Sequence, residues 1–321
     1  MKIASRRTPF GDRLCFADVV PHQLIDIQAA FVRRLETDGV HREDALVRSR
    51  LALAGDLPGL LQADPQLTVL HDLFDWTVSH ADGGVLDEDC LWSGDPARLG
   101  SPLGRPRTVW LMLANYPRGA RPGAQQPQQG ERPTMRGCLK AVSALAGPYD
   151  DLLHPAISSK VDPEVELGVV VGRRSRHLTV EDSPNAVAGY VLFCDSGSRD
   201  VSDTDSGRMD RAKGFDTYGI TGPWFVTPDE ITDPYDLSIR QWVNGELRQE
   251  GSTDQMIHTI PEQLAWLTEA ITLAPGDVLS TGTPPGHGAV APGDVVRGEI
   301  AGLGVIENTV VLDGWDNGGS K

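Results

Sequence analysis

The sequence predicts an α+β fold that is mostly β, with a small and partly helical N-terminal domain. From residue 165 onward, short apolar runs are separated by Gly and Pro, which is typical of strands. Residues 42–54 and 57–80 are instead rich in Leu and Ala, with apolar residues three and four apart, which is typical of helices. A chain of 321 residues has room for both parts. We therefore place an N-terminal domain or cap at residues 1–95 and a main domain at residues 96–321.

A long connector lies between the helix-like part and the strand-like part of the sequence. The run Val109 to Leu113 reads as a short buried strand, and the segment after it is rich in Gly, Pro and Gln without periodicity. A loop of this length in a compact domain is either disordered or functional. We expect residues 114–135 to form a long lid loop.

The main domain begins with strand-like runs and contains two hairpin signals. Asn244-Gly245 lies between apolar residues and suits a type I′ turn, which needs positive φ twice. A second hairpin is expected around residues 301–304, and a helix is expected to begin near Pro261. Strands are expected at residues 169–171, 187–194, 239–243, 278–279 and 295–312.

The charge of the chain excludes some classes of partner. Forty-five acidic residues against twenty-nine basic ones give a formal charge of -16, which repels nucleic-acid phosphates and anionic lipid heads. We expect no nucleic-acid partner and no membrane partner. The four cysteines form no CxxC pair, and no apolar stretch follows the basic N-terminus. A cytoplasmic location is therefore expected.

Glu164 and Glu166 are candidate metal ligands. Alternate residues of a strand point to the same face, about 6.6 Å apart along the chain. Two carboxylates so placed repel each other unless a positive charge lies between them, and an apolar run carries this strand into the core. The alternative is an exposed strand start with two solvated glutamates.

Asp195 is the third candidate ligand. It ends the apolar run of residues 190–194, where a carboxylate is costly unless it is paired or coordinated. Three carboxylates suit a hard cation, so we expect Mg²⁺, or else Mn²⁺ or Ca²⁺. An Asx turn, or an ion pair with Arg199, is the alternative for Asp195.

Two further segments are candidates for binding an anion. Lys213 precedes a glycine, so its ammonium group could approach a bound anion and stabilise an enolate or oxyanion. Thr283 lies in a Thr-Gly-Thr-Pro turn after a strand, where hydroxyl and amide groups could hold a carboxylate. A surface lysine and a plain turn are the alternatives.

Taken together, these motifs resemble the fumarylacetoacetate hydrolase family. The resemblance covers about residues 107–313 and keeps the family's order. The matching segments are residues 143–148, 162–172, 195–200, 211–217, 222–228, 243–249 and 281–286.

The resemblance implies a mixed β-sandwich roll, usually a homodimer, with Mg²⁺ or a related ion on Glu164, Glu166 and Asp195. Members of the family hydrolyse acylpyruvates and other β-dicarbonyls, decarboxylate oxo-acids, isomerise dienoates, or hydrate and dehydrate sugar acids. By position, Lys213 resembles the lysine that contacts substrate and Thr283 the threonine that binds its carboxylate. Arg199 also falls at a substrate-binding position, and Ser202 replaces a glutamine there. The implied partner is a small anionic oxo-acid.

The sequence departs from the family in the lid. Asn115-Tyr116 matches the start of its lid motif, but Gly119 and Pro122 stand where a His and a Glu that activate water are expected. Neither residue can accept a proton.

Three readings stay open. The base could come from elsewhere, with His287 or Glu131 as candidates, and the enzyme would then hydrolyse or decarboxylate an acylpyruvate-type substrate. Alternatively, the enzyme could be an isomerase or other lyase that needs no activated water. Finally, the chain could be a non-catalytic dimeric module. Arginines in the lid (Arg118, Arg121, Arg132 and Arg136) favour an anionic ligand.

Overall fold

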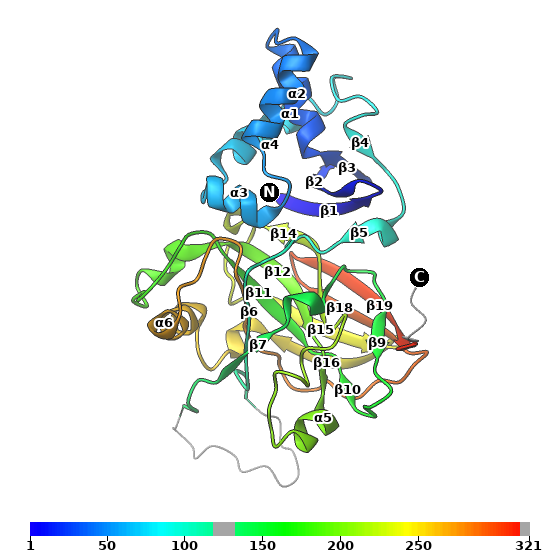
Figure 1. The fold of residues 1–321 in the computed structure, drawn as a ribbon, viewed down its shortest axis with the longest axis vertical. Helices are drawn as coiled ribbons and strands as arrows, with labels where there is room; N and C mark the ends of the chain where they lie inside the picture. The colour runs from blue at the N-terminus through cyan, green and yellow to red at the C-terminus, as the bar shows by residue number, and fades with distance from the viewer. Residues whose placement is uncertain (118–131, 315–321) are drawn as a thin grey trace.

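The computed structural model describes residues 1–117 and 132–314, and its ribbon is drawn in Figure 1. In these ranges the chain is mostly β, which confirms the predicted fold class. No helix among the described residues is both long and apolar enough to cross a membrane.

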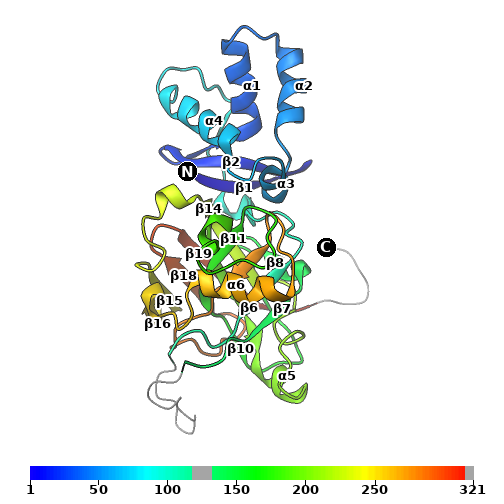
Figure 2. The same cartoon turned by 90° about the vertical axis from the view of Figure 1, so that its left-hand side faces the viewer.

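Four helices and several short strands make up the N-terminal part. α1, α2 and α4 stand over β1 and β2 at one end of the molecule, and α3 lies beside β1 (Figure 2). The elements are β1 (Lys2–Thr8), β2 (Gly11–Val20), β3 (Gln23–Asp26), α1 (Ile27–Thr37), α2 (Arg42–Ala52), α3 (Leu57–Ala63), α4 (Thr68–Ser79), β4 (Leu91–Trp92) and β5 (Leu99–Gly100).

Helices are present in both stretches for which they were predicted. Residues 57–80 hold two of them, α3 and α4, because α3 ends before Asp64. Asp64 precedes Pro65 and has an extended backbone, which is the conformation that a following proline favours. The sequence did not lead us to predict β1, β2, β3 or α1. The strands have no clean alternation, but the apolar residues Ile27, Ala30, Phe31 and Leu35 of α1 are three and four apart, so this helix had a readable pattern.

A twelve-stranded sheet runs through both parts of the chain. Its main path follows the order β4-β3-β2-β1-β14-β12-β11-β17-β6-β7, and β5 and β8 pair at its side. The remaining strands of this sheet are β6 (Val109–Met112), β7 (Gly137–Lys140), β8 (Leu145–Ala146), β11 (Val165–Val171), β12 (Val187–Asp195), β14 (Gly219–Val226) and β17 (Val278–Ser280).

The two parts of the chain meet where β1 pairs with β14. Lys2 lies opposite Val226 and Ile3 opposite Phe225 in this antiparallel pair. The sheet is therefore continuous across the expected boundary, and the division at residues 95 and 96 stays a prediction.

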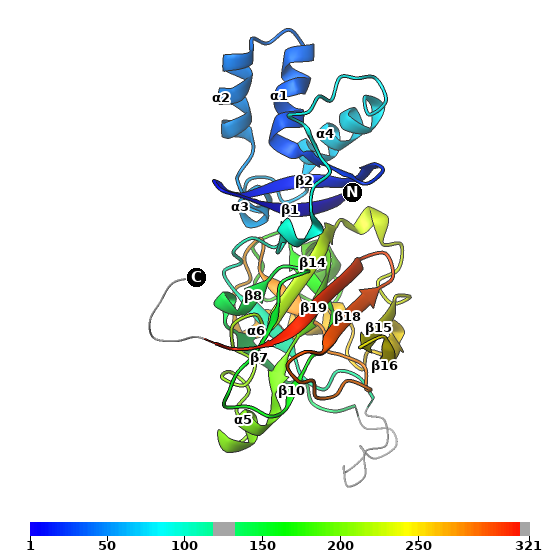
Figure 3. The same ribbon diagram turned by 90° about the vertical axis from the view of Figure 1, so that its right-hand side faces the viewer.

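A second, five-stranded sheet packs against the first in the order β16-β15-β18-β19-β9. Figure 3 shows β18 and β19 side by side with β15 and β16 beyond them. Its strands are β9 (Leu152–His154), β15 (Ser238–Val243), β16 (Glu246–Ser252), β18 (Val295–Ile300) and β19 (Gly304–Leu312), and β10 (Val161–Asp162) pairs separately with β13 (Gly197–Ser198).

Both predicted hairpins are confirmed. Asn244 and Gly245 have φ values of 52° and 80°, and they join β15 to β16 as a type I′ turn requires. β18 and β19 pair around Gly302, whose φ is 78°.

Two helices complete the main part, α5 (Arg199–Thr204) and α6 (Ile260–Ala270). α6 begins one residue before Pro261, with Thr259 as its N-cap. Thr259 and Glu262 form a capping box, which satisfies two backbone N–H groups at the helix start.

Candidate active site

The central strands β11 and β12 bring three carboxylates together. Every residue of β11 is buried, and β12 runs antiparallel to it with Val165 opposite Cys194. The backbone N–H of Asp195 donates to the Glu164 carbonyl at 2.8 Å. Glu164 before β11 and Asp195 at the end of β12 are therefore neighbours, and Glu166 lies one pleat further along.

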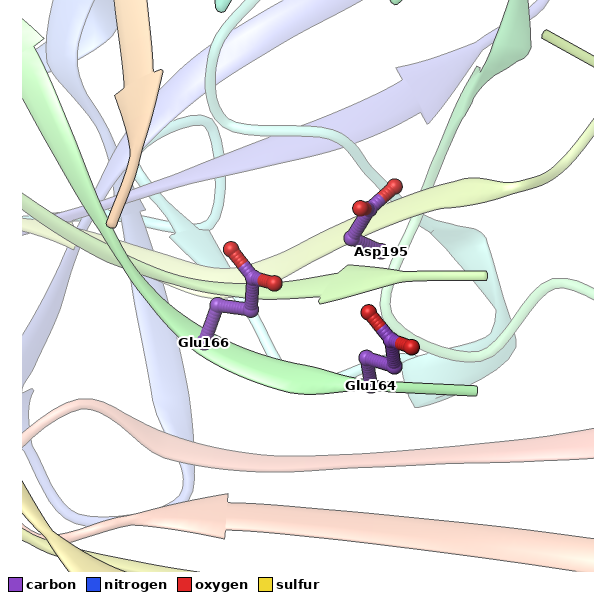
Figure 4. A group of neighbouring side chains, drawn as sticks. All are labelled: Glu164, Glu166 and Asp195. Atoms are coloured by element: carbon purple, nitrogen blue, oxygen red, sulfur yellow. The ribbon is translucent and has the colours of Figure 1, made fainter. Parts of the chain in front are cut away.

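Figure 4 shows the three side chains as neighbours, with Asp195 on the strand segment beside that of the two glutamates. Each of Glu164, Glu166 and Asp195 offers one carboxylate oxygen, and these atoms all lie within 4.8 Å of one another. Glu166 is 2% exposed and Asp195 is 1% exposed. Two buried carboxylates and the partly buried Glu164 at this separation repel one another strongly unless cations compensate them.

Glu166 is held by neutral donors. Its Oε2 accepts hydrogen bonds from Ser280 Oγ at 2.6 Å and from the Gly282 N–H at 2.9 Å. Burial, with Asp195 and Glu164 nearby, raises the pKa of Glu166 to about 8 despite the opposing effect of Lys213. The Glu166 carboxyl therefore carries a proton at neutral pH when no metal is bound.

Lys213 neutralises the other two carboxylates. Its Nζ lies 2.9 Å from Glu164 Oε2 and 2.6 Å from Asp195 Oδ2. Burial opposes the charge of the ammonium group, but Asp195 and Glu164 outweigh it and raise the pKa of Lys213. The lysine stays charged at the centre of the site.

Lys140 is a second buried lysine, which the sequence reading missed. Its side chain is 0% exposed, and Nζ lies 2.9 Å from Asp195 Oδ1. Nζ also donates to the carbonyl groups of Tyr218, at 3.1 Å, and Lys213. A lysine at the end of the short apolar run that forms β7 could have indicated a buried charge. Nothing in the sequence pointed to Asp195 as its partner.

Arg199 and His287 lie on the outer side of Glu164. His287 Nδ1 is 3.5 Å from Glu164 Oε1, and Arg199 Nη2 is 3.6 Å from the same oxygen. Burial lowers the pKa of His287, although Glu164 opposes this. A neutral imidazole can accept a proton, and among the described residues none hydrogen-bonds its Nε2.

The two hydroxyl candidates have local partners. Thr283 Oγ1 donates to the Val165 carbonyl at 2.7 Å and accepts from Gln249 Nε2 at 2.8 Å. Ser202 Oγ lies 3.3 Å from Met209 Sδ. Thr283 is therefore held beside the start of β11, whereas Ser202 has only a weak sulfur acceptor.

A cavity of about 890 Å³ opens onto the carboxylates. Of the residues singled out in the sequence, all but Asp195 line it: Glu164, Glu166, Arg199, Ser202, Lys213, Thr283 and His287. Tyr116 and Arg136 also line the wall, whereas Arg132 instead pairs with Glu262 at 2.8 Å. Gly119, Pro122, Glu131, Arg118 and Arg121 lie outside the described residues.

Comparison with known proteins identifies the family. Residues 108–311 match the family model described as fumarylacetoacetate (FAA) hydrolase C-terminal, which is more than half of the chain. This chain belongs to the fumarylacetoacetate hydrolase family. Its members include hydrolases, isomerases and tautomerases that act on small carboxylic acids, and the protein is an enzyme of this kind.

The named relatives of the family cover different shares of the chain. Oxaloacetate tautomerase FAHD2B, mitochondrial, of Bos taurus is 38% identical over 66% of this chain and 68% of the relative. Oxaloacetate tautomerase FAHD2A, mitochondrial, of Homo sapiens is 41% identical over 54% of this chain and 57% of the relative. These relatives match about half to two thirds of the chain.

A solved structure of the family resembles nearly the whole chain. It is maleylpyruvate hydrolase from Sphingobium sp. SYK-6 in complex with a manganese(II) ion and pyruvate, with 27% identity and a TM-score of 0.70. The similarity covers 97% of this chain and 99% of that one.

The carboxylate group fits a divalent cation. All three donors are oxygens, which hard cations prefer, and their separation allows one ion to bind them together. Asp195 Oδ1 is buried, and the ammonium group of Lys140 lies 2.9 Å from it. Glu164, Glu166 and Asp195 could therefore hold an ion, with water completing its shell.

The raised pKa of Glu166 predicts that metal binding depends on pH. Below about pH 8 a cation must displace the Glu166 proton, so the observed affinity for Mg²⁺ should rise with pH up to about 8 and then level off. For one displaced proton the slope approaches about tenfold per pH unit. Calorimetric titrations between pH 6 and 9, in buffers with different ionisation enthalpies, measure both the slope and the proton release. An affinity that does not change over this range would contradict the prediction.

Proposed function

We propose that the enzyme binds a small 2-oxo or β-dicarbonyl acid at a divalent ion held by Glu164, Glu166 and Asp195, and transfers a proton at the carbon next to the ketone. The convergence of these buried carboxylates beside Lys213, at the wall of a cavity, carries the proposal. Mg²⁺ is the proposed ion, with Mn²⁺ or Ca²⁺ as alternatives. An ion in this place would supply Lewis-acid stabilisation of an enolate-like state.

The chain's own residues supply the remaining electrostatics. The Lys213 ammonium group is fixed between two carboxylates and lines the cavity, so it can stabilise an oxygen that gains negative charge without reorganising. The guanidinium group of Arg199 lies at the cavity wall, where it can bind a substrate carboxylate. Thr283 is held beside the start of β11, and we assign it the same partner, for which its hydroxyl would have to release the Val165 carbonyl.

Tautomerisation or isomerisation without activated water is the reaction that we favour. Two relatives at 38% and 41% identity are named oxaloacetate tautomerases. Such a reaction needs neither of the residues that Gly119 and Pro122 replace.

The test follows the enol absorbance of oxaloacetate with the Mg²⁺-loaded protein. We expect faster equilibration of keto and enol forms, no more pyruvate than in a protein-free control with the same Mg²⁺, and loss of the acceleration with EDTA. An acceleration that survives EDTA would refute the role of the metal, and release of pyruvate above that control would refute this choice of reaction.

Hydrolysis or decarboxylation of an acylpyruvate-type acid is the second candidate. His287 favours it, because its imidazole is neutral, lines the cavity and has Nε2 available. The Sphingobium relative is named a maleylpyruvate hydrolase. If hydrolysis is right, ¹⁸O from labelled water enters the newly formed carboxylate, whereas decarboxylation releases CO₂ without adding that label. In either case His287→Ala removes cleavage while metal binding persists. Because the family consists of enzymes, we do not propose the non-catalytic module.

Homodimeric assembly and a cytoplasmic location stay predictions from the sequence. Sedimentation of the full chain tests the first and fractionation of the source cells tests the second.

A further inference from the structure

Asp162 is a buried carboxylate that the proposed reaction does not use. It is 5% exposed, precedes Glu164 by two residues, and lies outside the group of carboxylates that could share an ion. It also does not line the cavity. A buried carboxylate costs free energy unless it is paired, so its partner indicates what it does.

The partner of Asp162 is Arg199. β10 pairs with β13, with Asp162 opposite Gly197, and the Arg199 N–H donates to the Lys160 carbonyl at 3.1 Å. This pairing places the two side chains together, and Arg199 Nε donates a hydrogen bond to Asp162 Oδ2. The pairing of the two backbone segments thus holds Asp162 and Arg199 close together, in addition to the attraction between their charges.

The pairing fixes the direction of the guanidinium group. With Nε on Asp162, Nη2 lies 3.3 Å from His287 Nδ1 and 3.6 Å from Glu164 Oε1. Nη1 makes no hydrogen bond with any residue in the described ranges, and the Arg199 side chain is 38% exposed at the cavity wall. A planar guanidinium group held at one edge presents its remaining donors in one orientation.

We propose that Asp162 is a positioning residue that holds the Arg199 guanidinium group so that its unused donors face the carboxylate of the bound acid. The inference rests on the proposed function, since it assumes an anionic substrate on Arg199. Asp162 acts through Arg199, although its Oδ2 also lies 4.0 Å from His287 Nδ1, and it does not line the cavity.

When Asp162 is replaced, a positioning role and a purely electrostatic role predict opposite changes in the affinity for an anionic ligand. If Asp162 mattered only through its charge, removing that charge would strengthen the binding of an anion nearby. If it holds Arg199 in place, its removal frees a long side chain that must then be ordered on binding, and affinity falls by about tenfold. The sign of the change therefore distinguishes the two.

The experiment measures the dissociation constant of oxalate for the Mg²⁺-loaded full chain by calorimetry. We compare the wild type with Asp162→Asn, Asp162→Ala, Arg199→Ala and the double variant Asp162→Asn/Arg199→Ala. Asp205→Asn is the matched control, because Asp205 pairs with Arg211 at 3.0 Å and does not line the cavity. Mn²⁺ affinity and circular dichroism are measured for each variant, and Asp162→Asn keeps the shape of the side chain if Asp162→Ala fails to fold.

For Asp162→Asn we expect about tenfold weaker oxalate binding and unchanged Mn²⁺ affinity. With oxaloacetate as substrate, KM should rise with little change in kcat. Adding Asp162→Asn to Arg199→Ala should cause no further loss of oxalate affinity. The inference is overturned if Asp162→Asn binds oxalate equally or more tightly. It is also overturned if Arg199→Ala has no effect, or if the two losses add. Should the wild type itself bind no oxalate with Mg²⁺ present, the proposed function fails instead.

Discussion

Replacing Glu166 by glutamine should lower Mn²⁺ affinity and metal-dependent turnover by at least about a hundredfold. Loss of groups that merely support metal ligands costs about 10–100-fold, and loss of an anionic ligand should cost no less. Glutamine keeps the shape of the side chain and an oxygen that can accept from Ser280 and Gly282, so the fold should be preserved. Mn²⁺ titration by calorimetry and initial rates with oxaloacetate or an acylpyruvate measure the two effects.

Glu269→Gln is the matched control for this experiment. Glu269 is an exposed glutamate on α6, remote from the carboxylate group in sequence, and its substitution removes the same charge. We expect metal affinity and turnover to match the wild type in this variant. Wild-type Mn²⁺ affinity in Glu166→Gln would refute the assignment of the metal site.

Replacing Lys213 by methionine should lower turnover by about 10²–10³-fold without weakening metal binding. The ammonium group is a donor aimed at developing negative charge, and loss of one such donor typically has this effect. Because Lys213 is a cation beside the carboxylates rather than a ligand, its removal leaves Mn²⁺ affinity equal or higher. Lys213 and Glu166 are thus distinguished by opposite responses in metal affinity.

The same substitution should destabilise the metal-free protein. Lys213 is 3% exposed and lies against two carboxylates, so its loss leaves buried charge uncompensated and should lower the free energy of unfolding by about 3 kcal/mol. Saturating Mg²⁺ should restore much of this stability, because a ligand of the folded state stabilises it by mass action. Urea unfolding with and without Mg²⁺ measures both.

Lys140→Met is the comparison for Lys213→Met. It removes the other buried ammonium group beside Asp195, but Lys140 does not line the cavity. We expect a similar loss of stability with a smaller loss of turnover. Equal losses of turnover would indicate that Lys213 acts only by supporting Asp195.

The face of a strand on which each side chain lies could be predicted from the sequence. The Glu-x-Glu spacing with an apolar run after it predicted two carboxylates on one face, and the strand-end position of Asp195 predicted a third nearby. In the structure β11 and β12 lie side by side, which brings the three oxygens within 4.8 Å. The hairpin at Asn244-Gly245 was equally readable, because its turn depends on two adjacent residues.

Contacts between segments far apart in the chain could not be read in this way. The β1 to β14 pairing joins residues more than two hundred positions apart, and no local pattern marks it. Lys140 and Asp195 are also far apart in the sequence, as are His287 and Glu164, and yet each pair is in contact.

The sequence alone determined the family, the carboxylates that could bind a metal, and several strands of the main domain, although it did not predict β14. These predictions rest on neighbouring residues, because the alternation of apolar and polar residues and the residues of a turn specify which face of a strand a side chain occupies. Only the tertiary structure decided which faces meet. It placed Lys140 against Asp195 and Asp162 against Arg199, because the burial of a charge is tolerated only where the packing of distant segments provides its counterion.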